Sequence, residues 1–338
     1  MNTLEGYSIA IPAYGRPREF EELLTSILDS SIFPDEVIVC EDFSPERSDI
    51  TKVALRWTPL LESKGIKFSY IENDRNLGYD GNVRKLIESA AYKWVILMGD
   101  DDVILKDGLS IIKEFCLKNP NVSMISRPFL RFVDSINHPL GVSKVIDHET
   151  IVQYGGKFPS GFIFRTCGFV GGLVINKIWA SQYHTSKFDG SLFYQIFLGA
   201  HAYCTNGIGY LASPSVGART DNPPLFGNAG AEDHIPGSYS AKGRARMWKG
   251  VLTIADAVGK DYGIDLKEGL SRELMVRQAF HVFEMNSKAS KVELMDLKNE
   301  LIKLNLYNHW FPKTLYTINI TFGKYSKLFY TALRKVMQ

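Results

Sequence analysis

The stretch Trp94-Val95-Ile96-Leu97-Met98-Gly99-Asp100-Asp101-Asp102 joins an unbroken apolar run to three consecutive carboxylates. A short apolar run of this kind predicts a buried strand, and the carboxylates then lie at its C-terminal end. In open α/β sheets, ligands bind in the crevice outside the carboxyl ends of the strands. Three neighbouring carboxylates repel one another, so they need a proton, a cationic partner or a divalent metal. Oxygen ligands suit Mg²⁺ or Mn²⁺, while the alternative is a solvated acidic turn that caps the next helix.

Strand and helix patterns alternate on either side of this stretch, through about the first 135 residues. After the break at Gly15-Arg16-Pro17, apolar residues recur at helical spacing over residues 20–28. Such alternation is typical of βαβ units in a mainly parallel sheet. The predicted strands are residues 7–12, 36–40, 66–71 and 94–98, and the predicted helices are 20–28, 50–57, 80–90 and 107–118. Asp80 is expected to cap the third helix, and the alternative is that it accepts a hydrogen bond from a sugar hydroxyl.

The rest of the chain divides into an irregular and a helical part. Residues 136–240 are rich in Gly, Pro and aromatic residues, so we expect loops and irregular strands with one helix near 191–198. From residue 241 the pattern is helical, with helices expected over 241–257, 268–283 and 292–304.

Composition and charge restrict the class of protein. A net charge of +2 over 338 residues gives no argument for nucleic acid as a partner. The four cysteines are widely spaced and form no CxxC pair, as expected for reduced thiols in the cytosol. We see no secretory signal pattern and no apolar stretch long enough to cross a bilayer. The expected location is the cytoplasm, with the inner face of the plasma membrane as an alternative.

Four polar loops follow the successive predicted strands, and the carboxyl ends of parallel strands meet at one edge of a sheet. These loops are Pro12-Ala13-Tyr14-Gly15-Arg16, Glu41-Asp42-Phe43-Ser44, Asn73-Asp74-Arg75-Asn76-Leu77-Gly78 and Gly99-Asp100-Asp101-Asp102. In this order and spacing they resemble the nucleotide-sugar-binding half of the family-2 glycosyltransferases. Residues 76–82 (Asn-Leu-Gly-Tyr-Asp-Gly-Asn) and 99–102 look most like bacterial O-antigen and capsule enzymes of the abequosyltransferase type.

The resemblance implies a fold and an activity. The fold is GT-A, an α/β architecture with a Rossmann-like, mainly parallel sheet flanked by helices, over residues 1–240. Residues 1–120 would form the nucleotide-sugar-binding half and 121–240 the acceptor half, with a helical C-terminal extension over 241–338. The activity is transfer of a sugar from a nucleoside-diphosphate sugar to a saccharide acceptor, lipid-linked by expectation, in bacterial surface-polysaccharide biosynthesis. Most members of the family invert the anomeric configuration, and we expect the same here.

The resemblance also assigns donor-binding roles, each with a physical rationale. Tyr14 can stack on a base, and Asp42 can accept a hydrogen bond from a base N–H or a ribose hydroxyl. Arg16 or Arg75 can neutralise a diphosphate through bidentate contacts. Each residue also has a plainer alternative role. The Tyr14 ring could simply pack against its neighbours, Asp42 could start a turn, and the two arginines could be solvated. The full set of expected donor-binding residues is Pro12, Ala13, Tyr14, Arg16, Asp42, Arg75, Asn76, Gly78 and Asp100.

Metal binding is assigned by resemblance to Asp101 and Asp102. The metal motif of the family usually begins with an aspartate where this chain has Gly99, which leaves the register of the ligands open. A bound Mn²⁺ or Mg²⁺ would bridge the donor diphosphate and stabilise charge on the leaving group. Because no loop rich in Lys and Arg replaces such a cation, we expect metal dependence.

An inverting transfer also needs a base for the acceptor hydroxyl. In this family an acidic residue from the second half of the domain supplies it, and Asp189 is the best-placed candidate, ahead of a predicted helix. The alternative for Asp189 is a helix cap. Glu232 and Asp233 form the second candidate pair, in a Gly-rich loop that could instead be a mobile lid.

The last segment mixes aromatic rings with lysines and arginines and carries no acid after Glu300. A basic, aromatic helix can lie in a membrane interface, which would bring the protein to a lipid-linked acceptor. The alternative is a terminal helix whose aromatic rings pack on the domain.

Two rival functions remain open on sequence grounds. A non-catalytic member that binds carbohydrate or a partner is favoured by Gly99 and by the unassigned base. A sugar nucleotidyltransferase would need a Gly-rich basic loop after the first strand, where this chain has Ile11-Pro12-Ala13-Tyr14.

Overall fold

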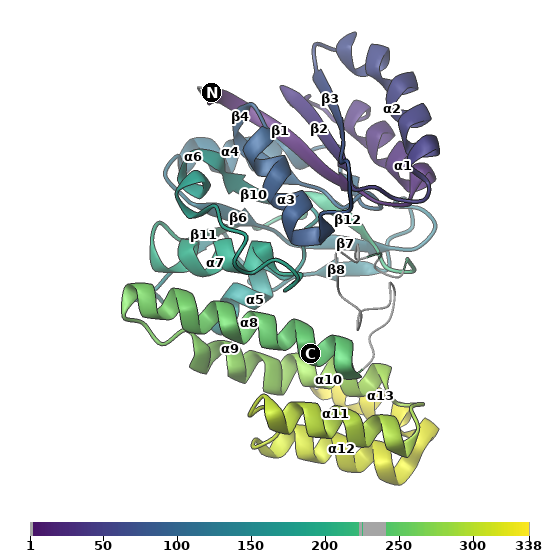
Figure 1. The fold of residues 1–338 in the computed structure, drawn as a ribbon, viewed down its shortest axis with the longest axis vertical. Coiled ribbons are helices and arrows are strands. Elements are labelled where there is room, and N and C mark those ends of the chain that lie inside the picture. Colours follow the sequence, from purple (N-terminus) through teal and green to yellow (C-terminus); the bar gives the residue numbers. More distant parts are fainter. Residues whose placement is uncertain (1–2, 223–224, 226–240, 338) are drawn as a thin grey trace.

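Two β-sheets organise the chain (Figure 1). The structure is a computed structural model that describes residues 3–222, 225 and 241–337. Its strands are β1 (Leu4–Ala13), β2 (Glu36–Glu41), β3 (Lys67–Glu72), β4 (Tyr92–Leu97), β5 (Val103–Ile104), β6 (Met124–Ser126), β7 (Phe129–Phe132), β8 (Gly141–Ser143), β9 (Thr150–Val152), β10 (Leu173–Asn176), β11 (Ile208–Tyr210) and β12 (Val216–Arg219). Within the described residues, one sheet has the order β3-β2-β1-β4-β10-β6-β11-β9 and the other β5-β12-β7-β8.

The larger sheet is mainly parallel, as the sequence predicts. β1 pairs in parallel with β2 and β4, and β2 pairs in parallel with β3. β10 lies antiparallel between β4 and β6 and separates the N-terminal half of the sheet from the later strands. The predicted α/β class with a mainly parallel sheet and a helical extension is therefore confirmed.

Helices cover both faces of the larger sheet. The helices are α1 (Pro17–Leu28), α2 (Arg47–Glu62), α3 (Gly78–Ser89), α4 (Gly108–Lys118), α5 (Gly161–Cys167), α6 (Lys177–Ala180), η1 (Ser181–Tyr183), α7 (Tyr194–Cys204), α8 (Ala241–Tyr262), α9 (Lys267–Glu273), the π-helical turn η2 (Leu274–Gln278), α10 (Ala279–Met285), α11 (Lys291–Lys303), α12 (Trp310–Phe322), η3 (Gly323–Tyr325) and α13 (Ser326–Met337). α1, α2 and α4 pack on one face, and α3, α5, α6 and α7 pack on the other.

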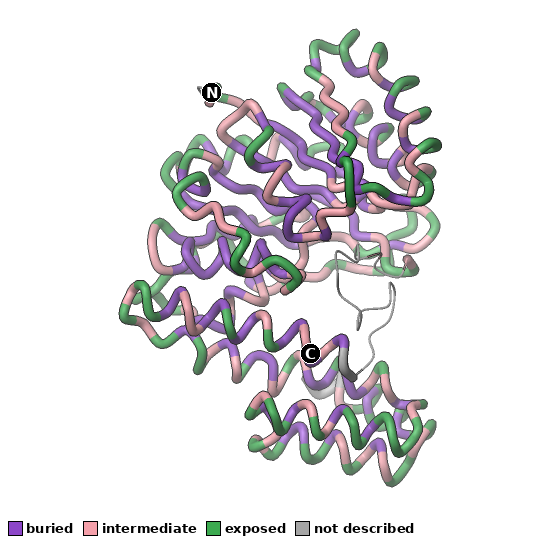
Figure 2. The backbone as a smooth tube through the Cα atoms, in the orientation of Figure 1, coloured by how far each residue is buried: buried purple, intermediate pink, exposed green. Residues whose placement is uncertain are grey.

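Apolar residues on both faces of each central strand produce this sandwich. In β1, Ile9 and Ile11 point to the layer of α1 and α2, whereas Ala10 between them points to the layer of α3. β4 repeats the pattern with Ile96 and Leu97, because successive side chains of a strand face opposite sides. Strands buried on both faces read as unbroken apolar runs, and they form the buried centre of the molecule in Figure 2.

The C-terminal helices share a core with the sheet. α8 packs along α7, and one cluster of buried side chains runs from Ala10 in β1 to Tyr330 in α13. Asn319 of α12 is buried, donates to the carbonyl oxygen of Phe283 at 2.8 Å and accepts from the Tyr330 hydroxyl at 2.8 Å. The predicted boundary at residue 240 adjoins a stretch outside the described residues, so it stays a prediction.

The middle of the chain departs from the sequence-based prediction. Residues 161–167 and 177–180 form short helices, α5 and α6, where we expected loops and irregular strands. Segments this short are set by tertiary packing more than by their own periodicity. The helix expected near 191–198 begins only at Tyr194 and continues to Cys204.

Candidate active site

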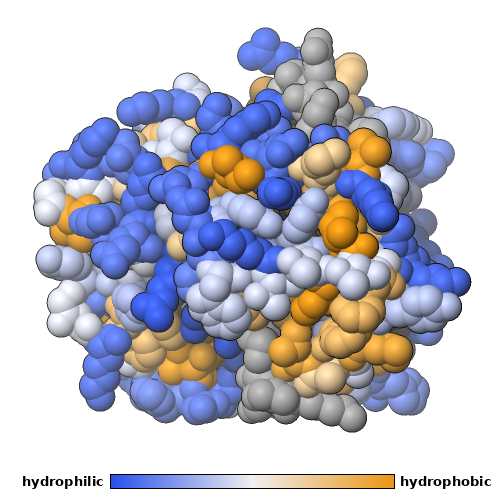
Figure 3. Space-filling view, turned by 90° about the horizontal axis from the view of Figure 1, so that it is seen from below, coloured by the Kyte–Doolittle hydropathy of each residue, from blue (hydrophilic) through white to orange (hydrophobic). Residues whose placement is uncertain are grey.

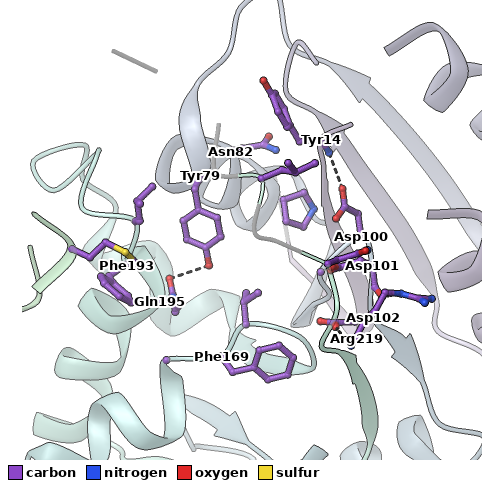
Figure 4. Close-up of a pocket in the computed structure, with 18 of the residues that line it drawn as sticks. Tyr14, Tyr79, Asn82, Asp100, Asp101, Asp102, Phe169, Phe193, Gln195 and Arg219 are labelled. Carbon is purple, nitrogen blue, oxygen red and sulfur yellow. Dashed lines mark hydrogen bonds between the residues drawn. The ribbon is translucent and has the colours of Figure 1, made fainter. Parts of the chain in front are cut away.

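A pocket of about 570 Å³ lies at the carboxyl edge of the larger sheet, where the loops after β1, β2 and β4 converge (Figure 4). Figure 4 shows the acidic triplet and Arg219 on one side, with Tyr79, Phe193 and Gln195 on the other. The described residues that line it are Pro12, Tyr14, Arg16, Asp42, Tyr79, Asn82, Gly99, Asp100, Asp101, Asp102, Phe164, Gly168, Phe169, Val170, Leu192, Phe193, Gln195, Arg219, Thr220, Asn222, Leu225, Arg244, Met247 and Gln278. The sequence-based expectation that the strand-end loops meet at one edge is thus met.

The loop after β1 holds the acidic triplet from one side. The backbone N–H of Tyr14 donates to Asp100 Oδ2 at 2.8 Å. Arg16 Nη1 lies 2.7 Å from Asp101 Oδ2 and 3.3 Å from Asp100 Oδ1. Arg16, predicted to contact a diphosphate, is therefore also a counter-charge for two of the three carboxylates.

Arg219 holds the triplet from the second sheet. Its backbone N–H donates to Asp102 Oδ1 at 3.3 Å, and its Nε donates to the carbonyl oxygen of Asp101 at 3.2 Å. Its Nη2 forms an ion pair with Glu22 of α1. The guanidinium lies over the ring of Phe132 at 4.7 Å. β12 thereby fixes the backbone of the triplet as well as one of its carboxylates.

Burial raises the pKa of all three carboxyls. The pKa of Asp100 rises to about 7, because burial and the charge of Asp101 outweigh the attraction of Arg16. Burial likewise raises the pKa of Asp101, and it raises that of Asp102 well above its ordinary range with the charge of Asp101 as the second cause. The three carboxyls therefore keep their protons to higher pH than isolated carboxyls do, and a cation bound to them would compete with those protons.

The donor set is compatible with a hard divalent cation. Among the residues that the structure describes, no group of three or more His, Cys, Asp or Glu side chains could enclose a metal ion. Mg²⁺ and Mn²⁺ nevertheless bind through one or two carboxylates when substrate phosphates supply the other ligands. The oxygen-only side chains of Asp101 and Asp102 fit that mode of binding.

The other end of the pocket is organised by Asp42. This buried carboxylate accepts from Asn73 Nδ2 at 2.8 Å and from the backbone N–H of Leu77 at 2.7 Å. Asn73 Nδ2 also contacts Asn82 Oδ1 at 3.1 Å, and Asn82 donates to the carbonyl oxygen of Cys40 at 3.0 Å. Burial raises the pKa of Asp42, and the hydrogen bonds it accepts oppose that rise. The loops after β2 and β3 are thereby tied to α3.

The wall opposite the triplet comes from residues distant in sequence. The Tyr79 hydroxyl, at the start of α3, donates to Gln195 Oε1 of α7 at 3.0 Å. Beside this pair the wall is apolar, with Leu192 and Phe193. One side of the pocket is therefore charged, and the other is apolar with one polar pair.

Most of the predicted donor-binding residues lie at this pocket. Pro12, Tyr14, Arg16, Asp42 and Asp100 line it, and so do the predicted metal ligands Asp101 and Asp102. Ala13 is fully buried beneath it. Asn76 Oδ1 accepts from the backbone N–H of Gly78, and Gly78 adopts a left-handed backbone conformation with φ of 71°. Arg75 is exposed and is not among the lining residues.

None of the candidate bases is among the described residues that line the pocket. Asp189 accepts from Arg84 Nη1 at 2.5 Å and Nη2 at 2.8 Å, and it lies outside the set of lining residues. It caps no helix, because α7 begins five residues later, at Tyr194. Glu232 and Asp233 lie outside the described residues. The assignment of the base therefore stays a prediction.

Several residues that line the pocket were not predicted from the sequence. Tyr79 and Asn82 belong to the quoted 76–82 motif, so that motif could have indicated them. Arg219, Gln195 and Met247 carry no local signal, because their place in the pocket depends on pairings between distant segments.

Comparison with known proteins points to a glycosyltransferase. Residues 8–156, somewhat less than half of the chain, match the family model described as Glycosyl transferase family 2. A relative from Salmonella typhimurium, the abequosyltransferase RfbV, is 22% identical over 250 residues, which are 71% of this chain and 70% of that protein. An uncharacterized glycosyltransferase from Haemophilus influenzae is 25% identical over 36% of this chain and 38% of its own length.

Solved structures share the fold of this glycosyltransferase. S. aureus TarS 1-349 superposes with a TM-score of 0.58 at 14% identity, over 98% of this chain and 92% of that one. The same protein in complex with UDP-GlcNAc gives a TM-score of 0.59 at 15% identity, over 96% and 88% of the two chains. The similarity extends beyond the family-2 segment into the C-terminal helices. None of the helices described here is both long and apolar enough to cross a membrane.

Proposed function

We propose that this protein is a family-2 glycosyltransferase that moves a sugar from a nucleoside-diphosphate sugar to a saccharide hydroxyl. The observation that carries the proposal is the pocket with Asp42 and Tyr14 at one end and the acidic triplet along one side. A nucleoside diphosphate has the matching distribution, a polar base and ribose followed by charged phosphates. The UDP-GlcNAc complex of TarS and the name of the abequosyltransferase support the same class of donor.

Each end of the pocket has a task in this proposal. Asp42 accepts a hydrogen bond from the base or ribose, and Tyr14 offers its ring to the base. Arg16 and Arg219 hold positive charge beside the donor diphosphate. Asp101 and Asp102 would hold Mg²⁺ or Mn²⁺, which would stabilise negative charge on the departing diphosphate. A cation held by these carboxylates would weaken the ion pairs of Arg16, whose guanidinium could then contact phosphate oxygens.

We further propose an inverting transfer assisted by a carboxylate base. Asp189 is the first candidate and the pair Glu232 and Asp233 the second. Asp189 is held by Arg84, so a base at this position would need the ion pair to loosen when the acceptor binds. Asp189→Asn is expected to lower kcat at least 100-fold while leaving donor binding within about twofold. An effect on donor binding of equal size would assign Asp189 a structural task instead.

Thermal unfolding with nucleotides tests the donor site. We would measure the melting temperature with UDP, GDP, CDP and dTDP, each with and without Mn²⁺. A ligand at 100 times its Kd stabilises by about 2.7 kcal/mol, which is readily detected. We expect a shift with one nucleotide that requires the metal and is lost in Asp101→Asn and Asp102→Asn. If no nucleotide shifts the wild-type protein, the proposed donor site is wrong.

The exposed C-terminal surface supports a lipid-linked acceptor. Some of the aromatic rings in this region pack inside, among them Tyr330, but Trp310, Tyr325 and Phe329 are exposed. Lys313, Lys324 and Lys327 are exposed on the same helices. Figure 3, viewed from the end of the molecule that carries α11–α13, has hydrophobic patches between hydrophilic side chains. We propose that this surface contacts the anionic inner leaflet and brings the pocket to a lipid-linked saccharide made for surface polysaccharide.

Vesicle flotation tests that contact. We expect the protein to float with phosphatidylglycerol-containing vesicles at low salt and not with neutral vesicles. Substitution of both Lys324 and Lys327 by Gln should weaken binding about 30-fold, since each cation near such a surface contributes about 1 kcal/mol. Absence of binding to anionic vesicles at low salt would remove the membrane proposal and leave the transferase proposal intact.

A further inference from the structure

Asp80 is a buried carboxylate whose hydrogen bonds lead away from its own helix. It lies in the first turn of α3, and its side chain is almost inaccessible to solvent. Its Oδ2 accepts from the backbone N–H of Leu192 at 2.8 Å, and its Oδ1 accepts from that of Tyr194 at 2.8 Å. The cap that the sequence predicted for Asp80 is therefore wrong. Both oxygens are used by a segment more than a hundred residues later.

Burial makes this arrangement costly. It raises the pKa of Asp80 to about 6, and the nearby charge of Asp189 adds to that rise, while the backbone N–H groups oppose it. The adjacent cation, Arg84, is already paired with Asp189. Burial of a carboxylate is unfavourable unless a cation or hydrogen bonds compensate it. For Asp80 this compensation comes from the backbone N–H groups of Leu192 and Tyr194.

The segment that Asp80 holds has a strained backbone. Leu192 adopts φ of 65°, in the left-handed region that is unfavourable for a residue with a branched side chain. The Arg84–Asp189 ion pair fastens the same segment three residues earlier. Two contacts from α3 therefore fix residues 189–194 in a conformation that the local sequence does not favour.

This segment forms the pocket wall opposite the acidic triplet. Leu192, Phe193 and Gln195 line the pocket, and Gln195 contacts Tyr79, the residue before Asp80 (Figure 4). The same helix carries Asn82, which is linked through Asn73 to Asp42 at the other end of the pocket. α3 thus connects the end assigned to the nucleoside with the wall that faces the triplet.

We propose that Asp80 is a positioning residue that holds the 189–194 segment in its strained conformation, so that Leu192, Phe193 and Gln195 orient the transferred sugar. This inference rests on the proposed function, because it assigns the sugar to the wall opposite the triplet. Asp80 itself contacts neither donor nor acceptor. Its loss should disorganise the sugar end of the pocket and spare the nucleoside end.

The test compares Asp80→Asn with a matched control. Asp49 is the third residue of α2, as Asp80 is of α3, but it is exposed and pairs with Lys52 at 2.7 Å. Binding is measured with UDP, GDP, CDP and dTDP, and hydrolysis with UDP-glucose, GDP-mannose, CDP-glucose and dTDP-glucose, all with Mn²⁺. For Asp80→Asn we expect the Kd of the preferred nucleoside diphosphate to stay within twofold and kcat to fall at least tenfold. For Asp49→Asn we expect neither to change.

A double-mutant cycle separates positioning from general destabilisation. Glycine adopts the left-handed backbone without strain, so Leu192→Gly should lessen the need for Asp80. We expect Asp80→Asn to reduce kcat at least threefold less in the Leu192→Gly background than in the wild-type background. Equal reductions in both backgrounds, or an equal loss of nucleotide binding and kcat, would overturn the inference.

Hydrogen exchange distinguishes this inference from the proposed function. Irrespective of any activity, the amides of Leu192 and Tyr194 should exchange at least tenfold faster in Asp80→Asn than in the wild-type protein or Asp49→Asn. Unchanged exchange would overturn the positioning role even if the protein is a transferase. If exchange is faster but the protein binds none of the four nucleotides, the contact of Asp80 with the 189–194 segment is upheld. The role in sugar orientation is then overturned, together with the proposed function.

Discussion

Arg16 meets two carboxylates of the triplet with a single guanidinium nitrogen. The sequence pointed to Arg16 and to the triplet as parts of the site but assigned Arg16 to a phosphate. A sequence does not show which of two possible partners an arginine contacts. Arg16 could pair with the triplet first and contact a donor phosphate afterwards. If a cation or a proton neutralised the triplet, the ion pairs of Arg16 would weaken, and its guanidinium could then contact the oxygens of a donor diphosphate.

Arg16→Gln should destabilise the protein when no metal is present. Without the guanidinium, the repulsion between Asp100 and Asp101 is less compensated. We expect the melting temperature at pH 8 to fall on the order of 5 °C, with partial recovery in Mn²⁺. Differential scanning calorimetry with and without the metal measures both effects.

Arg18→Gln is the matched control for that substitution. Arg18 lies on the exposed face of α1 and pairs only at the surface, with Glu22 at 3.2 Å. Surface pairs of this kind contribute little, so its melting temperature should stay within about 1 °C of the wild type. Equal decreases in the two variants would mean that Arg16 does not compensate the triplet.

At the scale of single residues, the sequence predicted the chemistry of the site better than its contacts. The acidic triplet and Asp42 stand at strand ends, where short-range patterns place them at the sheet edge. The partners of Asp80 lie 112 and 114 positions away, and the backbone partner of Asp102 lies 117 positions away. No local pattern specifies such pairs, because they depend on the complete fold.

At the scale of elements, long periodic segments were predictable and short paired ones were not. α1, α2 and α4 carry amphipathic patterns of eleven or more residues and were expected close to where they lie. β6 and β11 have only three residues each, and their pairing with each other joins segments some eighty residues apart. The predicted strands β1, β2 and β4 were found because their central residues are apolar on both faces, whereas β3 is a half-buried edge strand.

The contact between α7 and α8 should make stability depend on pH. His201 of α7 stacks on Tyr183 with ring centroids 4.1 Å apart, and its Nδ1 lies 3.0 Å from the Tyr262 hydroxyl of α8. Burial lowers the pKa of His201 to about 4. Below the ordinary pKa of about 6.5, the unfolded chain takes up a proton that the folded chain does not. The free energy of unfolding therefore decreases as the pH falls from about 6.5 to about 4.

His201→Gln should remove this component of the pH dependence. Relative to the variant, the wild-type protein should lose about 2 kcal/mol between pH 7 and pH 4, less than the full pKa shift implies because solvent screens part of the ring. Urea unfolding at several pH values measures the difference. The exposed His148→Gln is the control, and a His201→Gln curve parallel to the wild type would contradict the prediction.

At the scale of the whole molecule, one buried asparagine links three of the C-terminal helices to one another. Asn319 is buried between α10 and α13 and bonds to both. Asn319→Ala leaves the Phe283 carbonyl and the Tyr330 hydroxyl without partners, so we expect a loss of about 2–3 kcal/mol. Thr317→Ala, on the exposed face of the same helix, should change stability by less than about 0.5 kcal/mol. Calorimetry of both variants tests the prediction, which fails if the two losses are equal.

The helical character of residues 241–337 was predictable, but its attachment was not. The periodic pattern specifies which face of each helix is apolar, and it does not specify which surface that face covers. The core shared by β1 and α13 appears only when the chain is folded.

Many of the lining residues, from Phe164 to Met247 of α8 and Gln278 of η2, lie outside the segment that matches the family model. A recombination event that exchanged residues 8–156 alone with a relative would leave these side chains behind, and the resulting chimaera would combine one parent's donor loops with the other parent's pocket wall. Specificity in this protein is therefore not inherited as a module with the boundaries of the family segment. A crossover that transferred it intact would have to lie beyond Gln278.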